Sequence, residues 1–349
     1  MTIYKKNLLI IDQFEKLISQ IKYDIDHTSD KTKSMINYYR LRQIKNSLAI
    51  IKTFNKVIKC GNQLKDIKGI GKGTIDRIDE ILNTGRLSEL KIDTKEQKYL
   101  KQIDELEQIF GIGRKTAYEL ITKHNINSII ELKRAFKNGK IDLPYKIVLG
   151  LKYHNVYEQQ IPRAETNKIN KLIGNTIKLI DKDLIHIICG SYRRKKPISN
   201  DIDVLITHKK IITKVQLLQE NINNNYLHQL IEKLKEQNFI IDDIDKEYVI
   251  KYMGFCQLIY NKKKYKVRRI DFMYVPYESY YTALLHFTGS GEFNRKMREL
   301  AIELGYKLNQ YGLYKIDKNG KKIRIKINSE KCIFEKLGLE YLLPKQRSQ

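Results

Sequence analysis

The 349-residue sequence is poor in cysteine and has no long apolar segment. Its four cysteines are scattered, form no C-x-x-C pair and have no histidines nearby at ligand spacing, so we expect reduced thiols and no zinc site. The N-terminus lacks a small-residue cleavage site, which argues against a signal peptide. No apolar run approaches the ~20 residues needed to span a bilayer. These absences predict a soluble, intracellular protein.

Acidic residues are also scarce relative to basic ones. The sequence has 66 Lys and Arg against 40 Asp and Glu, a formal net charge of +26. An AT-rich genome, which the many Lys, Ile and Asn residues indicate, explains part of the lysine excess. A field this positive nevertheless attracts polyanions, and no long basic amphipathic helix indicates a membrane surface as the partner. The charge therefore favours nucleic acid.

Two segments carry a Gly-Ile-Gly turn between apolar residues, each followed by an amphipathic helix, at residues 64–82 and 106–121. Such a turn directs backbone N–H groups outward at the start of a helix, which suits a DNA phosphate. One copy is weak support, but two copies with the same spacing are stronger. They resemble helix-hairpin-helix motifs, which bind the duplex backbone without reading sequence. The resemblance makes Gly69, Gly71, Gly111 and Gly113 candidate DNA-binding residues.

The same resemblance implies a monovalent cation, Na⁺ or K⁺, at each hairpin. Backbone carbonyl groups would hold it, three from each segment. The residues at these positions are Lys65, Ile67, Ile70, Glu107, Ile109 and Ile112.

Three aspartates are placed where strands would bring them together. Asp201 and Asp203 are two residues apart in a run with period-2 alternation, so in a strand they share one face. In residues 266–276 the apolar side chains also alternate, and Asp271 leaves the core face. A lone D-x-D is usually a solvated strand end. Crowded carboxylates repel one another, however, and a third on a neighbouring strand is what a two-metal site requires.

A candidate phosphate site lies just before the D-x-D pair. Gly190 and Ser191 form a predicted turn, and Arg193 and Arg194 follow it. Backbone N–H groups and fixed positive charge bind phosphate oxygens. Carboxylates for metal beside a phosphate site predict nucleotidyl transfer.

Apolar periodicity predicts a mixture of helices and strands. The first 60 residues and residues 164–180 show helical spacing. A helix is also predicted at about 216–236, and separate strands at 248–252 and 254–260. The pattern predicts an α+β fold.

Taken together, these motifs resemble the family X DNA polymerases. The resemblance runs from about residue 40 to the C-terminal PKQRS. It depends on the two hairpins, IPR at 161–163, GSYRR and DID, RRID at 268–271 and, most specifically, HFTGSGEFNRKMR at 286–298. With this chain length we expect a compact member, without BRCT or PHP domains.

The resemblance implies four parts in a polymerase β-like hand. A helical, lyase-like DNA-binding domain with the first hairpin would occupy residues 1–95. A helical duplex-binding subdomain with the second hairpin would occupy 96–165. A catalytic palm of mixed or antiparallel sheet would occupy 166–277, and a nucleotide-selection subdomain 278–349.

The resemblance also assigns roles. Asp201, Asp203 and Asp271 would bind two Mg²⁺ or Mn²⁺ ions, with Arg269 beside them, and Arg298 would contact the template strand. The predicted nucleotide-binding residues are Arg163, Gly190, Ser191, Arg194, Asn200, Phe287, Gly289 and Asn294.

The implied activity is template-directed addition of dNTPs to a primer 3′-OH, as in short-gap filling during base-excision repair. The partners would be gapped or primed duplex DNA and dNTPs, with the protein a monomer in the nucleus, the nucleoid or a cytoplasmic replication site. An AP endonuclease and a DNA ligase would act in the same pathway. Two alternatives stay open: a template-independent nucleotidyltransferase, of the terminal-transferase or RNA-tailing type, and a non-catalytic DNA-end scaffold.

Several positions depart from the family pattern. Arg77 stands where the family's 5′-deoxyribose phosphate lyase has its Schiff-base lysine, and an arginine stays protonated and cannot take that role. Gly73 and Arg86 replace lysines of the 5′-phosphate pocket, leaving Lys72 and Lys65 as lyase candidates. We expect 5′-phosphate binding to survive and lyase chemistry to be weakened or relocated. His286 and Gly291 also depart from polymerase β, which puts ribonucleotide exclusion in doubt.

Overall fold

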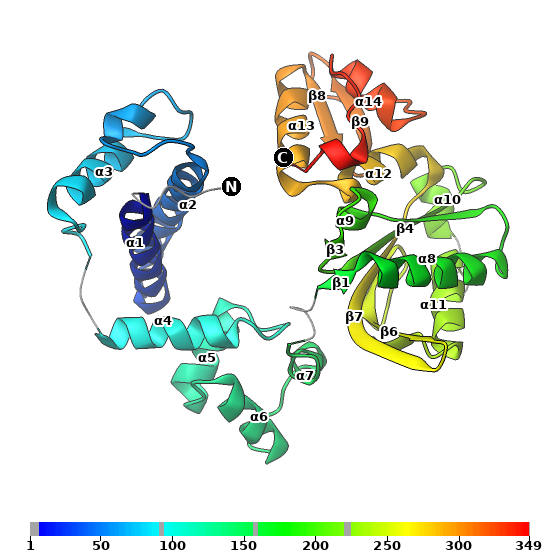
Figure 1. Cartoon of the computed structure of the whole chain (residues 1–349), viewed down its shortest axis with the longest axis horizontal. Coiled ribbons are helices and arrows are strands. Elements are labelled where there is room, and N and C mark those ends of the chain that lie inside the picture. Colours follow the sequence, from blue (N-terminus) through cyan, green and yellow to red (C-terminus); the bar gives the residue numbers. More distant parts are fainter. Residues whose placement is uncertain (1–6, 91–93, 156–159, 220–224, 349) are drawn as a thin grey trace. The chain divides into compact units, whose positions relative to one another are not determined.

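The computed structural model describes residues 7–90, 94–155, 160–219 and 225–348, which form two compact units, Met1–Lys152 and Tyr153–Gln349 (Figure 1). Within the described residues, no helix is both long enough and apolar enough to cross a membrane. The mixture of a helical N-terminal unit and a sheet-containing C-terminal unit confirms the predicted α+β class.

The first unit is helical throughout its described part. Asp30 caps α2 by accepting hydrogen bonds from the backbone N–H groups of Thr32 and Lys33. The helices are α1 (Leu8–His27), α2 (Lys31–Thr53), α3 (Lys72–Thr84), α4 (Thr94–Leu106), α5 (Arg114–His124), α6 (Ile129–Lys137) and α7 (Tyr145–Lys152), with a short 3₁₀ helix η2 (Gly61–Leu64) before α3.

An aromatic and ionic cluster joins the end of α1 to α4 and α5. His27 stacks on Tyr23 with ring centroids 3.9 Å apart, and both rings meet Tyr99 edge-on. Beside them, Arg114 Nη2 lies 2.7 Å from Asp26 Oδ2. This cluster joins α1 to the two helices that flank the second hairpin, α4 and α5.

The second unit is built on a five-stranded sheet with the order β2-β4-β7-β6-β5. Its apolar core lies between one face of this sheet and two helices. Before β4 in the chain come a short two-stranded sheet, formed by β1 and β3, and the helix α9. The elements are β1 (Ile161–Pro162), α8 (Arg163–Lys178), β2 (Leu184–Ile188), α9 (Gly190–Arg193), β3 (Ile198–Ser199), β4 (Ile202–His208), α10 (Lys214–Gln219), α11 (Tyr226–Glu236), β5 (Ile240–Asp243), β6 (Lys251–Tyr260) and β7 (Lys263–Tyr274); the covering helices are α8 and α11.

One strand pair differs from the others: β4 and β7 are parallel, whereas the remaining neighbours are antiparallel. Ile202 pairs with Ile270 and Val204 with Phe272, and all four are buried in the core below the sheet. Because side chains alternate between faces, the residues between them point to the opposite face.

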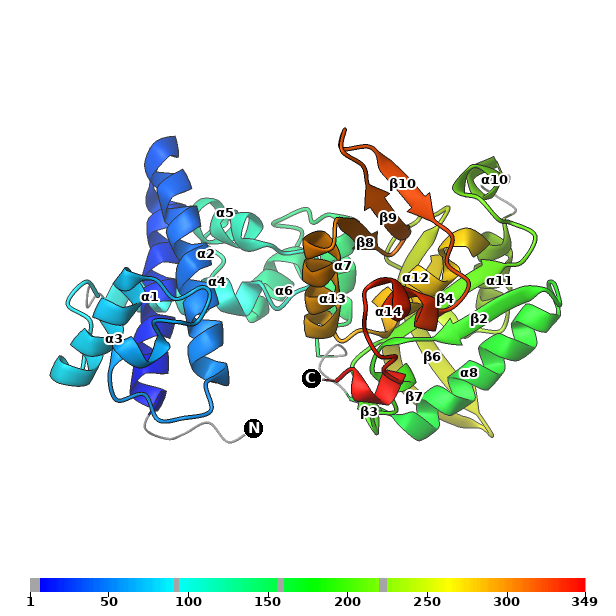
Figure 2. The ribbon, with the colours of Figure 1, turned by 90° about the horizontal axis from the view of Figure 1, so that it is seen from above.

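A smaller, three-stranded sheet with the order β10-β9-β8 and three helices complete the unit. Figure 2 shows β8 beside α13, and the core of this part is formed by their apolar side chains together with those of α14. The elements are η3 (Tyr277–Ser279), α12 (Tyr280–Thr288), α13 (Gly291–Glu303), β8 (Tyr306–Asn309), β9 (Gly312–Ile316), β10 (Lys322–Ile325), α14 (Glu330–Lys336) and η4 (Pro344–Gln346).

Three local predictions were wrong. The helix predicted at 216–236 is not continuous, because Asn225 is extended and its side chain caps a new helix, α11, at Tyr226. Residues 220–224 of this prediction lie outside the described residues. The strands predicted at 248–252 and 254–260 are one strand, β6, which continues through Gly254. The turn predicted at Gly190 is the short helix α9.

The predicted domain limits remain predictions. The two compact units separate between Lys152 and Tyr153, and the limit predicted at residue 165 falls within α8.

Candidate active site

The parallel pairing of β4 and β7 brings the predicted carboxylates together. Asp203 and Asp271 are direct partners in the ladder, on the face opposite the core, and Asp201 immediately precedes β4. Burial, and then the nearby Asp201 and Asp271, raise the pKa of Asp203 to about 7. Burial, and then the charge of Asp271, raise the pKa of Asp201 as well. Negative charge is therefore unfavourable at Asp201 and Asp203, which lie close to the third carboxylate, Asp271.

Arg269 offsets part of this repulsion. Its Nε and Nη2 lie 3.2 Å and 3.1 Å from the two carboxylate oxygens of Asp271, and its charge opposes the rise in the pKa of Asp203. Partly buried oxygen ligands with excess negative charge are what Mg²⁺ and Mn²⁺ prefer. The chemistry of the donor set therefore fits divalent cations, which Asp201, Asp203 and Asp271 would hold.

A cavity of about 400 Å³ adjoins Asp201 and Asp203. Every predicted nucleotide-binding residue except Arg163 lines it, although these residues come from three separate parts of the sequence. The lining residues are Gly190, Ser191, Arg194, Asn200, Asp201, Asp203, His286, Phe287, Gly289, Gly291 and Asn294.

Residues around α9 shape one wall of this cavity. Gly190 has φ +55°, and a Cβ on it would come within 3.2 Å of Asp203 Oδ2, so a larger residue is excluded on two counts. Ser191 Oγ hydrogen-bonds to Ser199 Oγ at 2.8 Å. The side chain of Arg194 reaches across to donate to the carbonyl oxygen of Thr288 (2.5 Å). Burial lowers the pKa of Arg194, whereas Asp203 opposes that change.

Arg163 acts on the loop after α9. Its Nη1 donates to the carbonyl oxygens of Tyr192 (2.7 Å) and Lys196 (3.4 Å), and its guanidinium lies 4.2 Å from the centroid of the Tyr192 ring. Arg163 therefore supports the segment that carries Arg194 and is not among the residues that line the cavity.

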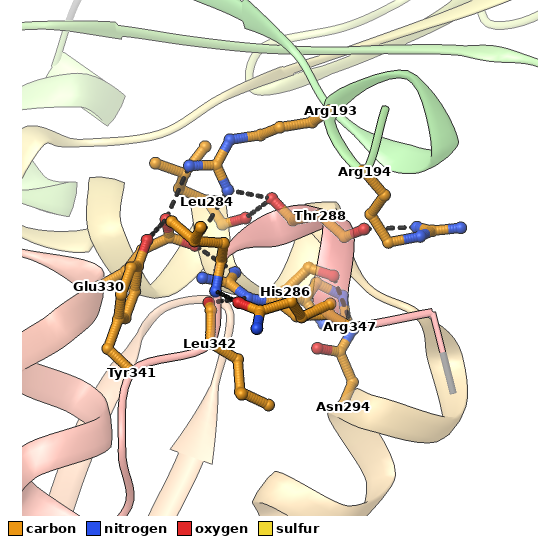
Figure 3. A network of polar contacts seen from close by, with 12 residues as sticks. Arg193, Arg194, Leu284, His286, Thr288, Asn294, Glu330, Tyr341, Leu342 and Arg347 are labelled. Carbon is orange, nitrogen blue, oxygen red and sulfur yellow. Dashed lines mark hydrogen bonds and ion pairs between the residues drawn. The ribbon is translucent and has the colours of Figure 1, made fainter. Parts of the chain in front are cut away.

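The opposite wall is organised around His286, which Figure 3 shows next to Asn294. Asn294 Nδ2 donates to the carbonyl oxygen of His286 (2.6 Å), and Arg298 Nη2 lies 3.0 Å from His286 Nδ1. Burial and the charge of Arg298 lower the pKa of His286. The imidazole is therefore neutral at pH 7 and accepts from Arg298 through Nδ1, which leaves the proton on Nε2.

The two glycine hairpins in the first unit have the same geometry. Gly69 has φ +102° and Gly111 φ +91°. In each hairpin the isoleucine after this glycine donates its N–H to a carbonyl three residues earlier, at 3.0 Å, from Ile70 to Ile67 and from Ile112 to Ile109. Gly71 and Gly113 then occupy the N-cap positions of α3 and α5. Both segments thus share the same hairpin backbone, whereas cation binding by their carbonyl groups stays a prediction.

A basic cavity of about 810 Å³ adjoins the first hairpin, in which Gly69, Gly71 and Gly73 face Arg42 and Arg77. Neither lyase candidate lines it: Lys72 and Lys65 are exposed and lie outside its lining.

Arg77 is held in place by its neighbours. Its Nε donates to Glu89 Oε1 (2.5 Å), and its Nη1 donates to the carbonyl oxygen of Gly73 (2.9 Å). Glu89 also binds Arg40 at 2.5 Å. A Cβ at Gly73 would come within 3.1 Å of Arg77 Nη1. The two departures from the family pattern at Gly73 and Arg77 therefore fit each other.

A second acidic group, not anticipated from the sequence, lies at the far end of β4. Ligand atoms of Asp181, Asp183 and His208 lie within 4.8 Å of one another. His208 Nδ1 accepts from the N–H of Lys210 (3.2 Å), so the ring carries a proton on Nε2, which lies 3.4 Å from Asp181 Oδ2. A ligating nitrogen must be unprotonated. We interpret this group as an ionic network, which also includes an ion pair between Asp183 and Lys210.

Family models account for most of the chain. The DNA polymerase beta palm model matches residues 160–277, the DNA polymerase beta thumb model residues 283–348, and a helix-hairpin-helix domain model residues 5–87. The palm match contains the three carboxylates, and the thumb match contains the wall around His286. The hairpin match contains Gly69 and Gly71.

Relatives agree with these matches. The chain is 29% identical over 361 residues to DNA polymerase lambda of Arabidopsis thaliana, covering 98% of this chain and 62% of the relative. It is 28% identical over 308 residues to DNA polymerase lambda of Rattus norvegicus (85% and 50%). It is 28% identical over 323 residues to DNA nucleotidylexotransferase of Xenopus laevis (86% and 62%). The chain thus spans between half and about three-fifths of the length of these relatives.

Hairpin, palm and thumb therefore follow one another in a single chain, with the acidic site in the palm. The chain belongs to the family X DNA polymerases, as its motifs predicted.

Proposed function

We propose that the protein is a template-directed DNA polymerase that transfers a nucleotide from a dNTP to a primer 3′-OH. The observation that carries the proposal is the ladder pairing of Asp203 with Asp271 beside a cavity lined by Ser191, Arg194 and Asn294. Acidic ligands next to groups that bind phosphate are the components of phosphoryl transfer. The two relatives that are named DNA polymerase lambda support the same class of reaction.

The residues have separable roles in this reaction. Asp201, Asp203 and Asp271 would hold two divalent cations, which when bound lower the pKa of the attacking hydroxyl and neutralise the triphosphate. Arg269 orients the carboxylate of Asp271 through two hydrogen bonds. Arg194 presents positive charge to the triphosphate, and its bond to Thr288 fixes its direction.

We infer that the preferred DNA is a short gap with a 5′-phosphate. Two hairpins of equal geometry suit the backbones on the two sides of a gap, and the basic cavity beside the first hairpin suits a terminal phosphate. Incorporation on a one-nucleotide gap with a 5′-phosphate should exceed that on an open primer-template. Equal rates on the two substrates would contradict gap filling while leaving the polymerase assignment intact.

A second candidate is template-independent addition, because one relative is named DNA nucleotidylexotransferase. The connection between strands β6 and β7 is short, because β6 ends at Tyr260 and β7 starts at Lys263. No long insertion lies there that could take the place of a template strand. Primer extension with and without the template strand separates the two. Comparable extension without template would favour the transferase.

We also propose that lyase chemistry in the first unit is weak. Schiff-base formation requires an amine that can lose its proton, and the residue at the family's lysine position is Arg77, bound to Glu89. Borohydride trapping on an incised abasic site should give little adduct. Strong trapping that is lost in Lys72→Arg or Lys65→Arg would instead assign the activity to that lysine.

A further inference from the structure

Two arginines and one glutamate form a buried charge network between α9, α14 and the C-terminal segment (Figure 3). Arg193 binds Glu330 through both terminal nitrogens, at 3.0 Å and 2.7 Å, and Arg347 Nη1 donates to the same carboxylate at 2.6 Å. Burial alone would raise the pKa of Glu330, but the hydrogen bonds from Arg193 and Arg347 lower it. Glu330 is therefore ionised, and the group carries a net positive charge inside the protein.

The side chain of Arg347 is 0% exposed. Its guanidinium lies 5.6 Å, 5.3 Å and 5.4 Å from the ring centroids of Phe293, Phe334 and Tyr341, and its Nε donates to the carbonyl oxygen of Leu342. Burying such charges costs free energy, and apolar replacements of similar volume are often as stable. Stability alone thus gives little reason to keep an arginine here, which directs attention to what the network positions.

The network holds the turn that follows α12 from two sides. The carbonyl oxygen of Arg347 accepts from the N–H of Ser290 (3.0 Å). From the other side, Arg193 Nη1 donates to Thr288 Oγ1 (2.6 Å), and the adjacent Arg194 donates to the Thr288 carbonyl oxygen. The backbone from Thr288 to Ser290 is therefore fixed by residues from the palm and from the last described turn of the chain.

This turn forms a wall of the nucleotide cavity. Gly289 and Gly291 line the cavity together with Arg194. Gly289 has φ +67°, and a Cβ on it would lie 3.1 Å from Arg194 Nη1, so the turn and Arg194 are packed against each other. A shift of the turn would displace both the surface that meets the incoming sugar and the arginine aimed at its phosphates.

We propose that Arg347 and Glu330 are positioning residues for the incoming nucleotide. Neither lines the cavity; they act through Ser290, Thr288 and Arg193 to set the distance between the turn and Arg194. The C-terminal segment is thereby part of the nucleotide site. This inference rests on the proposed polymerase function.

Steady-state kinetics on a one-nucleotide gap test the proposal with Arg347→Met and Glu330→Gln. Methionine fills the space among the rings without the charge, and glutamine keeps the shape of the glutamate. We expect the KM for dNTP to rise by about tenfold, with kcat falling by less than about threefold, because a misplaced wall weakens nucleotide binding first. Lys345→Met, an exposed change on η4, is the matched control and should leave both constants unchanged.

Two further variants separate positioning from folding. Arg347→Lys should recover part of the KM, because lysine supplies one of the donors that bind Glu330. The double variant Glu330→Gln, Arg347→Met should be no worse than the more affected single variant, since both changes break the same network. Independent, multiplying effects would overturn the proposed relay.

The failures are distinguishable. A lowered thermal midpoint with unchanged KM in Arg347→Met would mean that the network only stabilises the fold, and the inference would be wrong. If the wild-type protein incorporates no nucleotide, the polymerase proposal fails instead. The rise in thermal midpoint on adding dNTP with Mg²⁺ still compares nucleotide binding between wild type and variants, and an equal rise in all of them would contradict the inference.

Discussion

The acidic site in the second unit and the basic cavity in the first differ in how much of their expected chemistry they retain. In the acidic site, Asp203 and Asp271 face each other across a strand pair, and Arg269 stands beside them. In the basic cavity, the position expected to carry a reactive amine holds Arg77, bound to Glu89. Charged side chains are present at both sites, but no lysine is among the residues that line the basic cavity. We therefore propose binding at both sites and a reaction at only one.

The largest predicted effect removes the chemistry of the acidic site. Asp271→Ala should lower single-turnover incorporation by about a thousandfold or more, because it deletes a carboxylate that holds the divalent ions and orients the hydroxyl. DNA affinity should be nearly unchanged.

The matched control for Asp271→Ala is Asp183→Asn, which removes a carboxylate from the ionic network at the far end of β4. It should retain wild-type incorporation. Incorporation that survives Asp271→Ala, or that is lost in Asp183→Asn, would mean that the wrong acidic group has been assigned to catalysis.

A smaller effect is expected from the basic cavity, where binding without chemistry is proposed. Arg42→Gln, in the cavity lining, should weaken binding of a 5′-phosphorylated gap by about tenfold, the usual loss for a charge-assisted hydrogen bond. Fluorescence anisotropy with 5′-phosphate and 5′-hydroxyl gaps measures this.

Arg134→Gln, an exposed change on α6, controls for the loss of one positive charge. This substitution should weaken the binding of the 5′-phosphate gap and the 5′-hydroxyl gap slightly and equally. If Arg42→Gln also weakened both DNAs equally, the cavity would not recognise the terminal phosphate. The proposed binding role of the basic cavity would then be wrong.

The first glycine hairpin, which borders the basic cavity, is the subject of a prediction on stability. Gly69→Ala should destabilise the first unit by about 1–2 kcal/mol, because φ +102° is unfavourable for alanine. Its Cβ would also lie 2.5 Å from Asn46 Nδ2. Gly71→Ala has φ −107° and nothing within 4 Å of its Cβ. It replaces an N-cap glycine, which is preferred to alanine there, and should lower the thermal midpoint by less than Gly69→Ala. Equal losses in both would show that conformation at Gly69 is not what the hairpin requires.

The smallest effect concerns pH. The pKa of His286 is lowered in the folded protein, so between that pKa and 6.5 the unfolded chain binds more protons than the folded one. Stability should therefore fall as pH drops through 6.5 toward the folded pKa. The substitution His286→Gln removes the contribution of this histidine to the pH dependence of stability. Its thermal midpoint should decline less between pH 7.5 and 5.5 than that of the wild type, and identical declines would contradict a buried, neutral His286.

The acidic site was largely predictable because its features are local. Period-2 alternation places Asp203 and Asp271 on the faces opposite their apolar neighbours. Burial alternates along β7 as predicted, whereas every residue of β4 except Asp203 is buried. The parallel pairing that makes them direct neighbours was not predicted, since a sequence pattern does not state which strands pair.

Other features depend on contacts that no local pattern records. A glycine usually interrupts a strand pattern, yet Gly254 lies inside β6 because a Cβ there would meet Tyr252 Oη and the Asp242 carbonyl. Arginine is normally exposed, so nothing in PKQRS predicts that Arg347 is enclosed by three rings. The split at Asn225 had a signal, since asparagine is a favoured helix cap.

The parallel ladder of β4 and β7 also makes the enzyme resistant to a particular kind of error. A slip of one residue would turn Asp271 away from Asp203, but it would equally drive Phe272 and Ile270 out of the core, which they fill opposite Val204 and Ile202. Misalignment of the catalytic groups is thereby coupled to a loss of folding free energy. A population of well-folded but inactive molecules with shifted strands is excluded by the same apolar side chains that hold the sheet together.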